Sequence, residues 1–171
     1  ATTEIYTLSL HDSCPIGSDV ATVIAAIYYA ADSGAQIINA ACGFNAEQIA
    51  AGQMPQLMAA MTYTKTKNVL FISAAGNGDA SGKGYDITTK MDYPGSLIDD
   101  NLLTVAATAR SQITSYSNFS ATEVQVAAPG GDEFTPIFSL TTLNVAKADY
   151  VGMAGTSMAT PATCGVAALV W

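Results

Sequence analysis

The sequence is poor in the residues that several functional classes require. Its 171 residues contain one histidine, three cysteines and only six lysines and arginines, against fourteen aspartates and glutamates. The net charge of −8 argues against nucleic acid as a partner, because that interaction depends on basic residues that neutralise phosphates. Cys14, Cys42 and Cys164 lie far apart without CxxC spacing, so they predict no metal site. The apolar surroundings of Cys42 and Cys164 are typical of small core residues.

Long apolar runs are missing as well. No apolar segment reaches the roughly 18 residues that a membrane span needs, and no basic-then-apolar signal peptide opens the chain, which says nothing directly about export. Half of the residues are nevertheless apolar, enough for a substantial core. We therefore expect residues 1–171 to belong to one domain.

Apolar periodicity predicts strands that alternate with helices. Strands are expected at residues 5–10, 36–41, 68–73, 102–107 and 124–127, with weaker β segments at 137–140 and 150–153. One helix is expected from a cap at Ser18 to Gly34, a second from Pro55, and a third that starts near Ser157. Strand, helix and strand in succession with short connections indicate an α/β fold, with a parallel sheet and helices on its faces.

A serine, Ser157, lies where the last helix begins, in the stretch Gly155-Thr156-Ser157-Met158-Ala159-Thr160-Pro161. The N–H groups of a helix N-terminus and its positive dipole end favour negative charge beside the Ser157 oxygen. Taken alone, the pattern favours an ordinary helix cap, because Ser and Thr are common N-cap residues.

Three stretches resemble blocks of the subtilisin-like serine proteases and follow one another along the chain in the same order as in that family. They are the serine stretch above, Ser73-Ala74-Ala75-Gly76-Asn77, and Val126-Ala127-Ala128-Pro129-Gly130. Tyr93-Pro94-Gly95 resembles a wall segment of that family's specificity pocket, where the proline is often cis, although a plain turn fits this sequence equally well. The resemblance implies a three-layer αβα fold with a mainly parallel sheet.

The resemblance also implies roles for individual residues. Ser157 matches the nucleophile, and Asn77 matches the asparagine that forms the oxyanion hole with the Ser157 N–H. Without the serine, Asn77 would read as a turn residue between two glycines. Asn118-Phe119-Ser120 fits a glycosylation sequon, a triplet that is frequent by chance.

Two short segments match the walls that hold the substrate. Ala41, Cys42 and Gly43 match the edge along which a peptide lies as an added strand, and Ala74, Ala75 and Gly76 match the opposite wall of the primary specificity pocket. Small residues suit both positions because the peptide backbone must come close. Cys42 and Phe44 depart from the family's usual leucine and glycine, so the shape of the pocket entrance is left open.

The Asp and His of the family's catalytic triad have no match in this sequence. In subtilisin-type chains both precede the serine, so the resemblance implies a domain incomplete at both ends. The Asp and His would then come from the N-terminal part of the same catalytic domain, covalently attached or as a separate chain. His11 follows the place of the family's histidine block, which favours a surface-loop histidine over a catalytic base.

The sequence therefore predicts a serine endopeptidase with peptide or protein substrates, and a chain that is inactive by itself. The alternative is a catalytically silent subtilase-like module that binds peptides along residues 41–43. No cofactor is required. The resemblance allows a structural calcium ion, with oxygens from the acidic stretch Asp79 to Asp92 and from Asp99-Asp100, but no complete ligand set is visible and the sequence favours solvated acidic loops. The resemblance implies a secreted or extracytoplasmic location.

Overall fold

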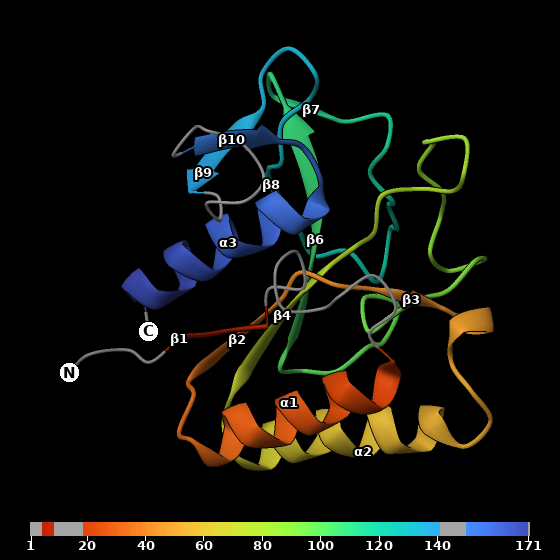
Figure 1. Ribbon diagram of the computed structural model, residues 1–171, viewed down its shortest axis with the longest axis vertical. Helices are drawn as coiled ribbons and strands as arrows, with labels where there is room; N and C mark the ends of the chain where they lie inside the picture. Colours follow the sequence, from red (N-terminus) through yellow and green to blue (C-terminus); the bar gives the residue numbers. More distant parts are fainter. Residues whose placement is uncertain (1–4, 9–18, 141–149, 171) are drawn as a thin grey trace.

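A mainly parallel β-sheet forms the middle layer of the structure (Figure 1). The computed structural model describes residues 5–8, 19–140 and 150–170. The strand order is β1 (Ile5–Leu8), β2 (Ile37–Ala40), β4 (Leu70–Ala74), β6 (Leu102–Ala109) and β7 (Gln112–Ile113), with β8 (Val126–Pro129) also paired to β6. Every pair in this sheet is parallel except β6 with β7. The carboxyl ends of the parallel strands therefore share one edge.

Helices cover both faces of the sheet. α1 (Val20–Asp32) and α2 (Gln53–Thr66) pack against each other on one face, and α3 (Thr156–Val170) lies across β2, β4, β6 and β8 on the other (Figure 1). Strand side chains alternate between the two cores: Ile38 packs with α1 and α2, whereas Ile37 and Ile72 pack with α3. Because both faces are covered, the strands are nearly continuous apolar runs. The predicted three-layer αβα fold is confirmed.

Several predicted boundaries are wrong by a few residues. The N-cap of α1 is Asp19 and not Ser18, because Asp19 Oδ1 accepts the Thr22 N–H at 2.8 Å. α2 begins at Gln53 and not at Pro55, which lies inside the first turn where its missing N–H costs no helical hydrogen bond. The end of α1 is as predicted, since Gly34 follows the C-cap with a left-handed φ of 86°.

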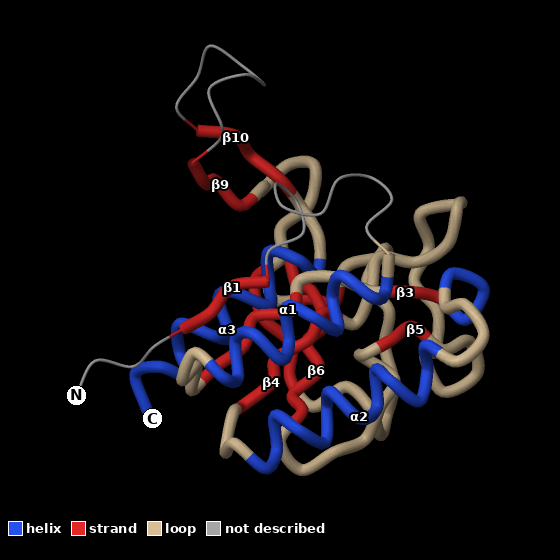
Figure 2. The backbone as a smooth tube through the Cα atoms, turned by 60° about the horizontal axis from the view of Figure 1, so that its bottom comes forward, coloured by secondary structure: helices blue, strands red, loops and turns tan. Residues whose placement is uncertain are grey.

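Two small antiparallel pairs lie outside the main sheet. β9 (Ile137–Leu140) and β10 (Tyr150–Met153) form an arm that projects beyond the body of the structure (Figure 2), and the sequence predicts both strands. β3 (Phe44–Asn45), which precedes the 3-10 helix η1 (Ala46–Gln48), pairs with β5 (Asp92–Tyr93). This second pair brings the segment after β2 beside the Tyr93-Pro94 segment. Within the described ranges, no helix is long and apolar enough to cross a membrane.

Candidate active site

The predicted nucleophile, Ser157, lies in the first turn of α3. Its hydroxyl donates a hydrogen bond of 2.9 Å to the carbonyl oxygen of Ala41, the first residue after β2. The side chain is half-buried, and the positive end of the α3 dipole lies next to it. The N-terminus of the helix therefore meets the sheet where β2 ends.

The backbone N–H of Ser157 is an open donor. The N–H of Thr156 is bound by Asn77, and those of Met158 and Ala159 point to the carbonyl of Gly155 at 3.0 and 3.4 Å. In the part of the chain that the structure describes, the Ser157 N–H has no hydrogen-bond partner. It is one of the N-terminal donors that a helix leaves available for a negatively charged group.

Asn77 reaches the same helix from the loop after β4. Its Oδ1 accepts hydrogen bonds from the N–H of Thr156 at 2.8 Å and from the Thr156 hydroxyl at 2.9 Å. A backbone N–H can only donate, so this contact fixes which side of the amide faces Thr156. The Nδ2 group of Asn77 points elsewhere and has no partner among the described residues.

The glycines around Asn77 make this position possible. Gly76 and Gly78 have φ values of 100° and 80°, so the chain turns on both sides of the asparagine in a conformation that other residues resist. A Cβ atom on Gly155 would lie 3.3 Å from Asn77 Nδ2, which is closer than such contacts normally come. Glycine at 155 therefore leaves room for the amide. Asn77 Nδ2 and the Ser157 N–H are thus two open donors at the N-terminus of α3.

The two predicted substrate walls lie at the carboxyl ends of adjacent strands: residues 41–43 follow β2, and residues 74–76 begin with the last residue of β4. The Ala41 and Cys42 side chains are buried, and Gly43 is exposed. Ala74 and Ala75 are buried too, and the Ala75 N–H already binds the carbonyl of Val105 at 2.9 Å. Burial of Cys42 and Cys164 confirms the expectation that both are core residues, and burial raises the pKa of Cys164 to about 12. Of the six wall residues, the two glycines are the least buried.

Asn118 holds the second wall in place, a role that the sequence reading missed. Its side chain is fully buried, and its Oδ1 accepts the N–H groups of Gly78 and Tyr85 at 3.1 Å each. Its Nδ2 donates to the carbonyl of Ala75 at 3.0 Å. A buried amide with these bonds fixes the loop around Asn77 and is not open to glycosylation in the folded chain. The sequon pattern gave no signal for this role.

Asp92 is a second residue whose position the sequence reading missed. Its carboxylate lies between the two predicted walls and receives weak hydrogen bonds from the Tyr85 hydroxyl at 3.3 Å and from Asn118 Nδ2 at 3.4 Å. Burial raises the pKa of Asp92 to about 6, against the opposing effects of the Tyr85 hydrogen bond and the Lys90 charge. The peptide bond between the following two residues, Tyr93 and Pro94, is cis, as the family resemblance suggested.

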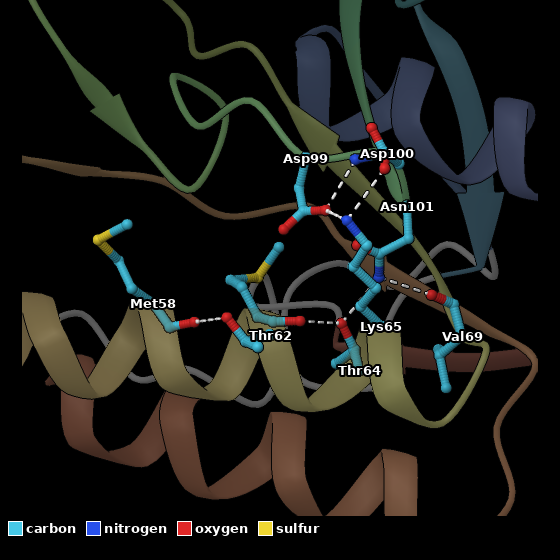
Figure 3. A network of polar contacts seen from close by, with 9 residues as sticks. Met58, Thr62, Thr64, Lys65, Val69, Asp99, Asp100 and Asn101 are labelled. Carbon is cyan, nitrogen blue, oxygen red and sulfur yellow. Dashed lines mark hydrogen bonds and ion pairs between the residues drawn. The ribbon is translucent and has the colours of Figure 1, made fainter.

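The acidic residues that were considered for calcium have other partners. Asp99 and Asp100 bind Lys65 Nζ at 2.7 and 3.1 Å, and the adjacent Asn101 ties the segment to α2 and Val69 (Figure 3). Asp79 accepts the N–H of Ser81 at 2.9 Å. Among the described residues, no three His, Cys, Asp or Glu side chains gather as a metal site. His11 lies outside the described residues.

Comparison with known proteins identifies the group to which this fold and site belong. The profile of the subtilase family (Peptidase_S8) matches residues 4–171, and the chain belongs to that family. The thermophilic serine proteinase of Bacillus sp. (strain AK1) is 36% identical over 154 residues, which cover 90% of this chain and 31% of that protein. Thermitase of Thermoactinomyces vulgaris is 31% identical over 155 residues, which cover 90% of this chain and 47% of thermitase.

Solved structures agree with this assignment. The epidermin leader peptide processing serine protease of Staphylococcus aureus superposes with a TM-score of 0.73 at 26% identity, covering 90% of this chain and 44% of that one. A prenylagaramide maturation protease superposes with a TM-score of 0.70 at 28% identity, covering 91% and 50%. The chain thus spans half or less of the length of these relatives.

Proposed function

We propose that the complete protein is a subtilisin-type serine endopeptidase that hydrolyses peptide bonds through an acyl-enzyme on Ser157. The observation that carries the proposal is the contact of Asn77 Oδ1 with Thr156, because it turns Asn77 Nδ2 outward while the Ser157 N–H stays open. An oxyanion hole needs two such donors beside the nucleophile.

The chemistry follows from these positions. A histidine takes the hydroxyl proton of Ser157, and Oγ attacks the carbonyl carbon of the substrate to form a tetrahedral oxyanion. Asn77 Nδ2 and the Ser157 N–H donate to that oxyanion. The amine then leaves with the proton from histidine, and water hydrolyses the ester in the same two steps. The Ala41 carbonyl oxygen accepts the Ser157 hydrogen bond, but it cannot act as the catalytic base because an amide oxygen is too weakly basic to hold the proton.

The Asp and His of the triad come from the N-terminal part of the same catalytic domain, continuous with this chain or separate from it. The outer face of α3 supports this part of the proposal, because it is apolar throughout yet exposed. Its residues are Pro161, Ala162, Gly165, Val166, Leu169 and Val170. Leu169 and Val170 are 87% and 82% exposed, and a contiguous apolar surface of this kind marks a contact with another segment.

A buried polar atom supports the same part of the proposal. Asn39 in β2 is 1% exposed, and its Oδ1 has no partner among the described residues. Asn39 lies on the same face of β2 as Ile37, the face that packs against α3. A donor from the catalytic segment that supplies the histidine would satisfy this oxygen, which otherwise costs about 1–3 kcal/mol.

The substrate is a peptide or protein that lies between the walls at residues 41–43 and 74–76. The exposed Gly43 and half-buried Gly76 let a peptide backbone approach both sides. The similar proteases named above include one that processes a leader peptide, which favours peptide precursors among the candidates. No cofactor takes part in this chemistry, and a structural calcium ion is compatible with it.

The location of the protein is proposed to be secreted or extracytoplasmic. Relatives named for their location include the cell wall-associated protease of Bacillus subtilis, 31% identical, and the intracellular serine protease of Paenibacillus polymyxa, 32% identical. The first supports the proposal and the second opposes it. Cell fractionation with an antibody against this chain decides between them.

Peptide hydrolysis by the full-length protein tests the proposed activity. We expect cleavage that is abolished by Ser157→Ala and retained in His11→Ala, since His11 is not assigned as the base. A folded protein that binds peptides tightly without cleaving them would instead support the catalytically silent binding module. Rapid cleavage by residues 1–171 alone, lost in His11→Ala, would contradict the assignment of the base to another segment.

A further inference from the structure

The carboxylate of Asp92 occupies the space between the two predicted substrate walls. A Cβ atom on Gly43 would collide with Asp92 Oδ1, and a Cβ atom on Gly76 would collide with Asp92 Oδ2 and with the Asn118 amide. One glycine belongs to each wall, so the carboxylate bridges them. Pairing of β3 with β5, in which Asn45 faces Asp92, fixes the backbone that carries it.

The negative charge of Asp92 is poorly compensated in this position. Its two hydrogen-bond donors, Tyr85 and Asn118, are neutral, and their bonds of 3.3 and 3.4 Å are long. None of the ion pairs formed by the described residues includes Asp92. The nearest basic residue in sequence, Lys90, places its ammonium over the Tyr85 ring at 4.4 Å from the centroid. Burial of a carboxylate without a cationic partner is costly, which calls for a function.

Each of the two glycines lies within two residues of a residue that binds the start of α3. Gly43 is two residues beyond Ala41, whose carbonyl binds the Ser157 hydroxyl, and Gly76 is adjacent to Asn77. Two extended residues span about 7 Å. A peptide whose scissile carbonyl meets Ser157 and Asn77 would therefore direct the neighbouring side chain between Gly43 and Gly76. A long side chain with a terminal cation would reach the Asp92 carboxylate there.

We propose that Asp92 is the specificity-determining residue of this site and selects substrates with lysine or arginine on the acyl side of the scissile bond. This inference rests on the proposed function. An ion pair with a guanidinium or ammonium group supplies the cationic partner that the described residues do not provide, and charge-assisted hydrogen bonds of this kind are strong. Arginine fits best, because its planar fork can engage both carboxylate oxygens. Asn118 and Tyr85 act as positioning residues for the carboxylate.

Cleavage of matched peptides by the full-length protein tests this inference. The peptides differ only at the residue before the scissile bond, which is arginine, lysine, leucine, glycine, or citrulline as a neutral isostere of arginine. We expect kcat/KM for arginine to exceed that for citrulline by about 100-fold. In Asp92→Asn the arginine value falls to the citrulline value, which itself stays unchanged. Asp99→Asn, which alters a carboxylate paired with Lys65 elsewhere, serves as the control and keeps the preference.

A binding measurement separates this inference from the proposed catalytic function. Titration of the Ser157→Ala protein with benzamidine, a small aromatic cation, requires no turnover, and we expect saturable binding that Asp92→Asn abolishes. If no peptide is cleaved and no serine is labelled, the proposed endopeptidase function is overturned, while the cation-binding result still decides the role of Asp92. Equal cleavage of arginine and citrulline peptides, or cation binding unaffected by Asp92→Asn, would overturn the role of Asp92. A preference for glycine that Asp92→Gly broadens to leucine would also overturn it, because the carboxylate would then merely fill the space.

Discussion

The Ser157 hydroxyl donates a hydrogen bond of 2.9 Å to the carbonyl oxygen of Ala41, although 116 residues separate the two. The bond joins the first turn of α3 to the end of β2, so it places the predicted nucleophile at the sheet edge where the parallel strands end. Ligands of open α/β sheets bind at this edge. In the proposed mechanism, a catalytic base takes over the hydrogen that the Ala41 carbonyl now accepts.

Replacement of the Asn77 amide tests the oxyanion donor. Asn77→Asp keeps an oxygen for Thr156 but removes the Nδ2 donor, so we expect both Asn77→Asp and Asn77→Ala to lower kcat with little change in KM. For the corresponding asparagine of subtilisin itself the loss is about 10²–10³, a value that belongs to that enzyme and is used here only as a guide. Peptide hydrolysis by the full-length protein measures it. Full activity of Asn77→Asp would contradict the role.

The contact between Thr156 and Asn77 should influence turnover through positioning alone. Thr156→Val removes the 2.9 Å hydroxyl bond and leaves the 2.8 Å backbone bond, so kcat should fall about 3- to 10-fold at constant KM. Thr160→Val is a matched control, since that buried hydroxyl binds the Thr156 carbonyl and not Asn77. If both variants lose activity equally, the cause is a change in the helix and not the orientation of Asn77.

Asp92 should make folding stability depend on pH. Its pKa is about 6 in the folded chain and about 4 when unfolded, so the unfolded state loses its proton first and the native state loses stability as pH rises from 4 to 6. Asp92→Asn should therefore match the wild type near pH 4 and exceed its stability by about 3 kcal/mol above pH 7. Burial raises the pKa of Tyr85, which donates to Asp92, above its ordinary value near 10, so its hydroxyl stays neutral between pH 4 and pH 8.

Denaturant unfolding of both proteins at pH 4 and pH 8 measures this difference. A constant gap across the two pH values would show that the carboxyl does not titrate in this interval. Greater stability of the wild type at pH 8 would show that a cation compensates Asp92 in the complete protein.

The apolar face of α3 should be covered in the complete protein. Leu169→Lys would then bury a charge and lower the free energy of unfolding by about 2–4 kcal/mol. Tyr29→Lys on α1, also highly exposed at 69%, should change it by less than about 0.5 kcal/mol. Urea unfolding of the full-length variants compares the two positions. Equal, small effects would mean that the face of α3 stays in water.

Local sequence patterns predicted most of the helices and strands because apolar side chains recur with the period of each backbone conformation. Period-two and period-3.6 apolar spacing located the strands and helices, and the lone glycine at 34 marked the end of α1. The prediction of Ser18 as the N-cap of α1 was wrong because Ser and Asp are both favoured cap residues. Only the hydrogen bond of Asp19 to the Thr22 N–H decides between them.

The candidate site was only partly predictable because its contacts join distant segments. The family motifs named Ser157 and Asn77, whose roles remain predictions, but nothing local indicates that Asn77 binds Thr156 across 79 residues. Asn118 matched a sequon, although in the fold its amide is buried under the Asn77 loop. Asp92 belonged to an acidic stretch that resembled a solvated loop, and only tertiary packing places its carboxylate between Gly43 and Gly76.

Covalent labelling of the full-length protein with a fluorophosphonate tests the central claim most directly, because that probe reacts only with an activated serine. Intact mass and peptide mapping should place one label on Ser157, with no label in Ser157→Ala and slower labelling in Asn77→Ala. A folded, full-length protein that stays unlabelled, or that carries the label on another serine, would contradict the assignment of Ser157 as the nucleophile.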